Sequence, residues 1–194
     1  MPKLGMEPIR RRALIEAAVE AIGERGALDV TMSQIARRAG VSAALAHHYF
    51  GSKERLFLAT MRHLLRQFGL SVATALRSET DPRRRLSLIV AESFASTQFT
   101  PATVSAWLAF YAYAQHDAGA RRLLHVYARR LNANLVHDLR QFVGGDAPRV
   151  AEGVAALIDG LYIRRALAAT AADPETAIAL VEDYLDTQLA RSPS

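Results

Sequence analysis

Apolar residues recur at intervals of three and four along the whole chain, and no segment shows the every-second-residue alternation of a half-buried strand. Leu14, Ala18 and Ile22 form one such row within residues 7–25. Spacing of this kind places apolar side chains on one face of a helix. The pattern therefore predicts an all-α fold whose first amphipathic helix covers residues 7–25, and Gly23 and Gly26 allow this helix to end.

Helix-start signals define the next two elements. Thr31 is followed three positions later by Gln34, which is the pattern of a capping box, and Gly40 is the type of residue that commonly ends a helix. Ser42 is a favoured N-cap residue. We therefore expect a short helix from Thr31 to Gly40 and a second one over residues 43–50.

Further helix starts are marked by a capping side chain followed by the first helical residue, which is a proline in three of the four cases. The pairs are Ser52-Lys53, Asp81-Pro82, Thr100-Pro101 and Asp173-Pro174. Gly144-Gly145-Asp146 interrupts the remaining long segment, which predicts one helix over 118–143 and another over 148–170. About nine helices are expected in total, with a frayed end at residues 192–194.

Composition narrows the possible functions. The chain has 194 residues, of which 51% are hydrophobic, so it can form one domain or a small domain with a larger one. It contains no cysteine, which excludes disulfides, thiolate metal sites and cysteine nucleophiles and fits a reducing cytosol. No apolar run approaches the roughly 20 residues of a membrane helix, and the first residues lack the apolar core of a signal peptide. A cytoplasmic location without membrane attachment is expected.

The net charge of +5 is distributed unevenly. Residues 1–53 carry 8 basic and 5 acidic side chains, net +3, whereas the remaining 141 residues carry 16 and 14, net +2. The basic set has 22 arginines and only two lysines, Lys3 and Lys53. The first quarter of the chain is therefore the more basic part per residue, as expected for a segment that meets a polyanion.

The two short helices joined by residues 39–42 fit a helix-turn-helix. Ile35 and Ala36 are expected to face inward on the first helix, and Phe50 on the second. In such a unit the second helix lies in the DNA major groove. Lys53 supports this interpretation, because a lysine in the first turn of a helix opposes the macrodipole and is better explained by an external anion.

Residues 31–42, TMSQIARRAGVS, and 48–56, HYFGSKERL, resemble the DNA-binding domain of TetR-type transcriptional repressors. Segments 1–17, 106–110 and 156–167 are similar to the choline-responsive branch of that family, which controls glycine betaine synthesis genes. The resemblance implies a DNA-binding domain over 1–52 and a ligand-binding and dimerisation domain over 53–194. It also implies a homodimer through the last two helices, a palindromic operator and derepression by choline.

The resemblance assigns roles within the first domain. Phosphate contacts are expected from Thr31, Ser42, Tyr49 and Lys53, and Ala43, Ala44 and His47 are expected to line the groove-facing side of the second helix. The full DNA-binding set also includes Ser33 and Arg37. Two positions depart from the family pattern, since many members have glycine at Ala44 and tyrosine at His47.

Several of these residues also have ordinary structural explanations. Arg37-Arg38 and Arg10-Arg11-Arg12 fit solvated surface as well as phosphate contacts. A metal site at His47-His48 is disfavoured, because neighbouring side chains on a helix point about 100° apart and no other ligand lies nearby in sequence. Tyr49 fits either a core position or one with an exposed phenol.

Aromatic residues mark the candidate ligand site of the larger domain. From the residues alone, plain core packing and a ring cluster for a ligand both remain open. By the resemblance, a quaternary ammonium such as choline would be held by ring faces, with a carboxylate for charge balance. The candidate rings are Phe94, Trp107, Phe110, Tyr111 and Tyr127, and the candidate carboxylates, each interrupting an apolar helix pattern, are Glu92 and Asp159.

Two other functions are alternatives to a choline-responsive repressor. An enzyme is disfavoured because the sequence shows no Ser-His-Asp order, phosphate loop or HExxH motif, and no cofactor or metal is expected. A TetR-type repressor that senses a hydrophobic drug or an acyl ligand is the closer alternative, and an apolar pocket without a carboxylate would favour it. In either repressor, we expect the helix beginning at Lys53 to couple the ligand to DNA binding.

Overall fold

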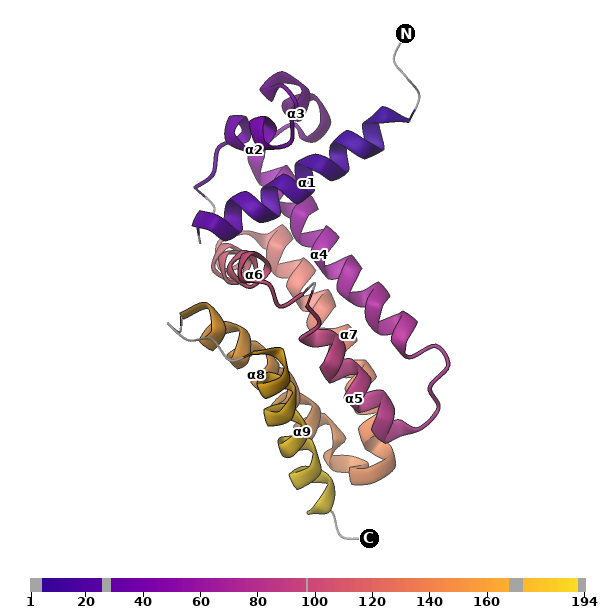
Figure 1. Ribbon diagram of the computed structural model, residues 1–194. Coiled ribbons are helices and arrows are strands. Elements are labelled where there is room, and N and C mark those ends of the chain that lie inside the picture. Colours follow the sequence, from indigo (N-terminus) through magenta and orange to yellow (C-terminus); the bar gives the residue numbers. More distant parts are fainter. Residues whose placement is uncertain (1–4, 26–28, 97, 168–172, 192–194) are drawn as a thin grey trace. The chain divides into compact units, whose positions relative to one another are not determined.

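The computed structural model describes residues 5–25, 29–96, 98–167 and 173–191, and within them the fold is entirely helical (Figure 1). The all-α prediction is confirmed, and nine α-helices and one 3₁₀ turn are present in these ranges. They are α1 (Met6–Arg25), α2 (Met32–Arg38), α3 (Ala43–Phe50), α4 (Lys53–Ala75), α5 (Pro82–Ser93), α6 (Pro101–Ala114), α7 (Ala118–Val143), the 3₁₀ turn (Gly144–Asp146), α8 (Ala147–Leu167) and α9 (Pro174–Ala190).

The predicted helix starts at Pro82 and Pro174 are confirmed, and their expected caps form. Asp81 accepts the N–H of Arg84 at 2.8 Å and Asp173 accepts that of Thr176 at 2.7 Å. Hydrogen bonds with the Thr176 backbone and side chain hold the pKa of Asp173 below its ordinary value. The expected helix end at Gly26, the last predicted turn at 168–170 and the frayed end at 192–194 lie outside the described residues.

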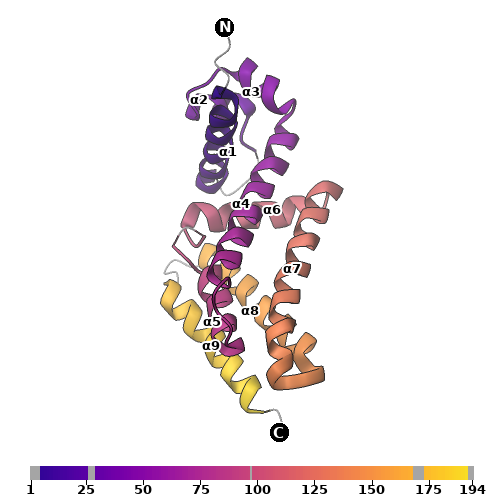
Figure 2. The same cartoon turned by 90° about the vertical axis from the view of Figure 1, so that its right-hand side faces the viewer.

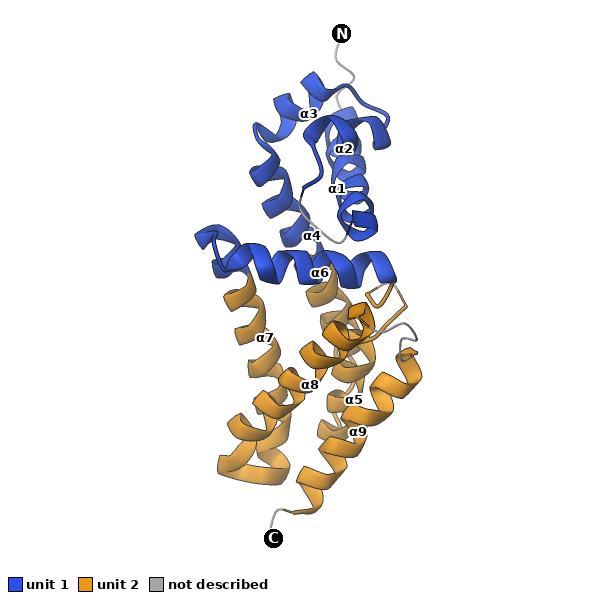
Figure 3. Cartoon of the chain, turned by 90° about the vertical axis from the view of Figure 1, so that its left-hand side faces the viewer, with its two compact units in different colours: residues 1–65, 101–123 blue, residues 66–100, 124–194 orange. Residues whose placement is uncertain are grey.

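The packing divides the chain into two compact units, coloured separately in Figure 3. Unit 1 comprises residues 1–65 and 101–123, and unit 2 comprises residues 66–100 and 124–194. The boundaries fall inside α4 and inside α7. These units group residues by packing, whereas the expected boundary between residues 52 and 53 separates functions, and that boundary stays a prediction.

Unit 1 is built around α1, which packs on α2, α3 and α6. Its core contains the fully buried side chains of Leu14, Ile22 and Ile35. The contact with α6 is close enough to require a glycine, because a Cβ at Gly23 would lie 2.5 Å from the Cα of Ala102. The end of α1 and the start of α6 therefore pack backbone against backbone.

In unit 2, α9 packs along both α5 and α8 (Figure 2). Arg83 of α5 reaches Glu182 and Asp186 of α9, each at 2.6 Å. Arg85 links α5 to the buried Asp138 of α7, with 2.8 Å between Nε and Oδ1. None of the helices in the described part of the chain is both long and apolar enough to cross a membrane.

Candidate nucleic-acid interface and effector-binding groups

The helix-turn-helix forms where the sequence places it. Thr31 and Gln34 make a complete capping box, in which the Gln34 N–H donates to Thr31 Oγ1 at 3.2 Å and Gln34 Oε1 accepts the Thr31 N–H at 2.8 Å. Gly40 has a φ of +67°, a conformation that side chains disfavour, and it turns the chain between α2 and α3. The N–H of Leu45 then donates to Ser42 Oγ at 3.2 Å, which fixes the start of α3 at Ala43.

Helix α3 has one buried face and one exposed face. Phe50 is buried as predicted, and Tyr49 is half-buried. Ala46 is fully buried although it was not predicted to be a core residue, and its four-residue spacing from Phe50 is the pattern that indicates its burial. Ala44 and His47 are exposed, as a groove-facing position requires, whereas Ala43 is half-buried.

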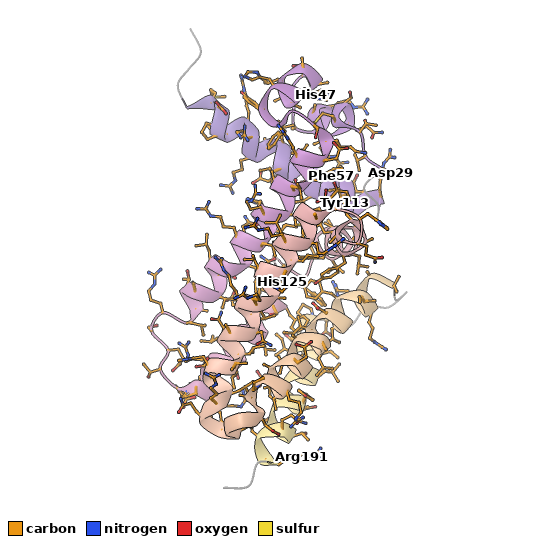
Figure 4. All side chains as sticks on the ribbon, turned by 180° about the vertical axis from the view of Figure 1, so that it is seen from behind. Asp29, His47, Phe57, Tyr113, His125 and Arg191 are labelled. Carbon is orange, nitrogen blue, oxygen red and sulfur yellow. The ribbon has the colours of Figure 1, made fainter. Side chains whose placement is uncertain are left out.

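The two histidines of α3 have separate environments. His47, which Figure 4 labels, has its Nδ1 3.1 Å from the carbonyl oxygen of Gly51. Since a carbonyl oxygen can only accept, this nitrogen carries the proton. Nε2 of the neutral ring is therefore an acceptor. The His48 ring contacts the Tyr49 ring instead, with centroids 5.6 Å apart.

Arg11 holds the C-terminal end of α3, a role that was not predicted from the sequence. Its Nη1 donates to the carbonyl oxygen of Tyr49 at 2.6 Å, and its guanidinium lies 4.6 Å from the centre of the Phe50 ring. Glu7 lies 3.5 Å from the same Nη1. Because Arg11 and Tyr49 are 38 positions apart, no local pattern reveals this contact.

The remaining candidates for phosphate contact are exposed or half-buried. Ser33 and Arg37 are exposed, and among the described residues no carboxylate lies within 4 Å of Arg37. Arg38 instead binds Glu24 and Glu20, and the hydrogen bond with Glu24 raises the pKa of Arg38. Lys53 is half-buried, and its Nζ lies 5.5 Å from the centre of the Phe57 ring.

Unit 2 contains a cluster of three buried rings. Phe94 and Phe99 meet edge to face with centroids 5.1 Å apart, and Tyr162 contacts both, at 6.0 and 5.1 Å. The Tyr162 hydroxyl donates to the carbonyl oxygen of Ser93 at 2.5 Å, which fixes the ring. Phe99 and Tyr162 were not among the predicted ligand residues. The guanidinium of Arg165 already lies 4.4 Å from the centre of the Phe99 ring.

Tyr127 and Asp159 lie beside this cluster. Burial raises the pKa of Tyr162, and the charge of Asp159 raises it further. Burial also raises the pKa of Tyr127, with smaller contributions from Tyr162 and Asp159. The predicted carboxylate Asp159 is thus near two phenol rings of unit 2, although its own side chain is exposed.

The other predicted ligand residues lie in different places. Trp107 and Tyr111 belong to unit 1, where their rings are 6.0 Å apart on α6, and Phe110 is buried on the same helix. Glu92 is half-buried on α5 in unit 2.

Two regions of the chain match known protein families. Residues 14–60 match the model of bacterial regulatory proteins of the tetR family, and residues 82–190 match that of the C-terminal region of BetI-type transcriptional repressors. The chain belongs to the TetR family, in its BetI-type branch. It is therefore a DNA-binding transcriptional repressor and not an enzyme.

Curated relatives agree over the full length. The HTH-type transcriptional regulator BetI of Brucella melitensis is 56% identical, covering 100% of this chain and 98% of its own. The protein of the same name from Agrobacterium fabrum is 57% identical, covering 100% and 94%. As a TetR-family regulator, the chain binds DNA and a small-molecule effector.

Solved structures show the same fold. A transcriptional regulator from Pseudomonas aeruginosa PAO1 has a TM-score of 0.82 at 25% identity and covers 97% of this chain and 94% of its own. A regulator from Saccharomonospora viridis, solved in complex with choline, has a TM-score of 0.79 at 24% identity, with 91% and 95% covered. The region of the BetI-type match includes every predicted ligand residue, from Glu92 to Asp159.

Proposed function

We propose that this BetI-type repressor responds to choline, binds a palindromic operator as a homodimer and is released from it by the effector. The observation that carries the choline assignment is the ring cluster of unit 2, where Tyr127 and Tyr162 lie within the electrostatic influence of Asp159. A quaternary ammonium has no N–H to donate, so ring faces and a nearby carboxylate are the groups that recognise it. The Saccharomonospora viridis protein, similar in fold, was solved with this ligand.

One observation favours the second candidate, an acyl ligand. Arg165 lies over the Phe99 ring, so the cluster also offers a guanidinium to a carboxylate. A fatty acid would pair with this cation and leave Asp159 unused, whereas choline would use Asp159. Choline binding would therefore depend on Asp159, whereas fatty-acid binding would depend on Arg165.

Thermal-shift measurements with choline, betaine aldehyde, glycine betaine, a fatty acid and an unrelated hydrophobic drug separate these candidates, because a ligand that binds the folded state raises the melting temperature. We expect choline to give the largest shift and Asp159→Asn to remove it. A larger shift with the fatty acid, lost in Arg165→Gln, would favour the acyl ligand.

The predicted ring residues are tested in two groups. Trp107→Ala and Tyr111→Ala change unit 1, whereas Phe94→Leu and Tyr127→Phe change unit 2. Loss of the choline shift with an unchanged operator affinity identifies a ligand residue. Loss of operator affinity in Trp107→Ala would instead mark Trp107, which is 5% exposed, as part of the core. Phe110 and Glu92 are also proposed as ligand residues, and the same two measurements test them.

For DNA binding, we propose that His47 reads a base edge, that Ala43 and Ala44 allow close approach to the groove, and that the other predicted residues contact phosphates. Nε2 of neutral His47 accepts hydrogen bonds, so it suits the amino groups of adenine or cytosine. Duplexes selected from a random pool should contain an inverted repeat. His47→Ala should relax selection at one position in each half-site, and His48→Ala, its neighbour, should not.

The proposed homodimer uses α8 and α9. Leu167 is 77% exposed on α8 and Leu180 is 49% exposed on α9, and exposed leucines on helices of this kind mark an interaction surface. Two-fold pairing explains a palindromic operator, because each subunit supplies one α3, the recognition helix that enters the major groove. Leu180→Glu should shift the sedimentation coefficient toward that of the monomer, and the control Val126→Glu on α7 should leave it unchanged.

A further inference from the structure

Helix α7 carries a concentration of positive charge that the proposed function does not use. It contains five arginines, two histidines and a single carboxylate, Asp138. Asp138 is 2% exposed and is bound by Arg85 of α5. Because Arg85 balances this carboxylate, the arginines on the surface of α7 are not compensated by their own helix.

A groove of about 600 Å³ runs along one face of α7 within unit 2. Its basic lining residues are His125, Arg129, His137 and Arg140, and Figure 4 labels the first of them. His137 Nε2 lies 3.9 Å from Oδ1 of Asp138. Small or uncharged side chains such as Asn132 lie between them. The lining also includes one carboxylate, that of Glu152 on α8.

The cations occupy the two ends of this groove. Arg129 and Arg140 are eleven residues apart, which corresponds to about 16 Å along a helix. His125 lies one turn before Arg129, and His137 lies just under one turn before Arg140, so each arginine has a histidine on the same face. Each end of the groove therefore carries an arginine and a histidine of α7, and the α7 side chains that line the groove between them are uncharged.

Among the described residues, no carboxylate lies within 4 Å of the guanidinium of Arg129 or Arg140. Arg83 on α5 shows the contrast, since it binds two carboxylates of α9 at 2.6 Å. Unbalanced cations at both ends of a groove favour an anion that spans them.

We propose that this groove binds an extended small anion that bears phosphate groups at both ends, such as a short linear polyphosphate. The volume lies within the range of small-molecule sites, about 300–1,000 Å³. An acidic helix of a second copy is less suited, because Glu182 and Asp186 of α9 already bind Arg83. This site does not depend on the choline assignment.

Isothermal titration calorimetry of the full chain with inorganic phosphate, tripolyphosphate and a short linear polyphosphate tests the site. We expect affinity to rise with chain length, because only a long anion reaches both ends. The double variant Arg129→Gln/Arg140→Gln should lose at least about tenfold in affinity for the longest probe, as expected for charge-assisted hydrogen bonds. Glu152→Gln should bind it more tightly, because a repulsive carboxylate is removed.

Arg130→Gln is the matched control, because it removes the same charge from an exposed position of α7 that is not part of the groove. Arg129→Lys/Arg140→Lys keeps the charge and should retain most of the binding. Unchanged melting temperatures of the glutamine variants show that the fold is intact.

Four results would overturn the proposal. They are the absence of any binding, an equal loss of affinity in Arg130→Gln, a changed sedimentation coefficient in the double variant, and a changed operator affinity in it. The second would indicate non-specific charge attraction, the third an interface between copies of this chain, and the fourth a nucleic-acid surface.

Discussion

In the DNA-binding arrangement proposed above, single side chains of unit 1 either contact DNA or hold α3, the recognition helix, in place. Arg11 belongs to the second group, because its guanidinium binds the Tyr49 carbonyl and lies against the Phe50 ring. Lys53 belongs to the first group in the account proposed above. The salt dependence of DNA binding separates the two roles, since only a phosphate contact releases a counterion.

Arg11→Met should lower operator affinity by about tenfold, because it removes a hydrogen bond to a charged group, worth about 1.5 kcal/mol, that positions α3. The slope of log affinity against log salt concentration should stay the same. Arg12→Met is the control, because Arg12 binds only the exposed Glu16 at 2.8 Å among the described residues. A slope reduced by one unit in Arg11→Met would instead identify Arg11 as a phosphate contact.

Lys53→Ala should weaken binding to all duplexes equally and reduce the salt slope by about one unit, as loss of one phosphate contact requires. Fluorescence anisotropy at four or more salt concentrations measures this slope for operator and random DNA. Arg66→Ala, a charge removed from an exposed position of α4, should leave the slope unchanged. If Lys53→Ala also leaves it unchanged, Lys53 does not contact phosphate.

Helices were predictable from the sequence to the extent that their boundaries are set locally. The Thr31-Gln34 capping box, the Ser42 cap and the Asp-Pro pairs all act within four residues, so α2, α3, α5 and α9 begin where expected. Contacts between elements were not predictable in the same way. The bond from Arg11 to Tyr49 and the rings of Phe99 and Tyr162 depend on tertiary packing, which leaves no periodic mark in the sequence.

The approach of α1 to α6 gives a prediction for a whole element. Gly23→Ala should destabilise the protein by about 1–3 kcal/mol, because the new methyl group would collide with the backbone of Ala102. Gly69→Ala on α4 is the matched control, and since no atom lies within 4 Å of the position that the new Cβ would take, it should stabilise the protein by about 0.5–1 kcal/mol. Urea unfolding measures both. Equal stability of Gly23→Ala and wild type would show that the two helices lie farther apart.

Arg85 joins three elements of unit 2. Its Nε binds Asp138 of α7, and its Nη1 donates to the carbonyl oxygens of Leu76 and Glu79, which follow α4. Arg85→Ala should cost about 3–5 kcal/mol in the free energy of unfolding, because Asp138 would be left buried without its cation. Arg84→Ala, at the neighbouring exposed position, should change stability by less than about 0.5 kcal/mol. A similar small loss in both variants would contradict this role of the ion pair.

Regulation by choline requires that choline binding in one part of the protein change the affinity for the operator in another. Helix α4 is continuous from Lys53 to Ala75, and its first part is counted with unit 1 and its second part with unit 2. A displacement of α4 caused by the effector would therefore move residues of the DNA-binding unit, and in a two-fold dimer it would alter the spacing of the two recognition helices. Such coupling is reciprocal, because choline can weaken operator binding only by the factor by which the operator weakens choline binding.

Calorimetric titration of choline into free protein, and into protein saturated with its selected operator, measures this coupling. The account predicts weaker choline binding to the operator complex, with a tenfold difference corresponding to about 1.4 kcal/mol of coupling. Equal choline affinity for the free and the operator-bound protein would contradict it.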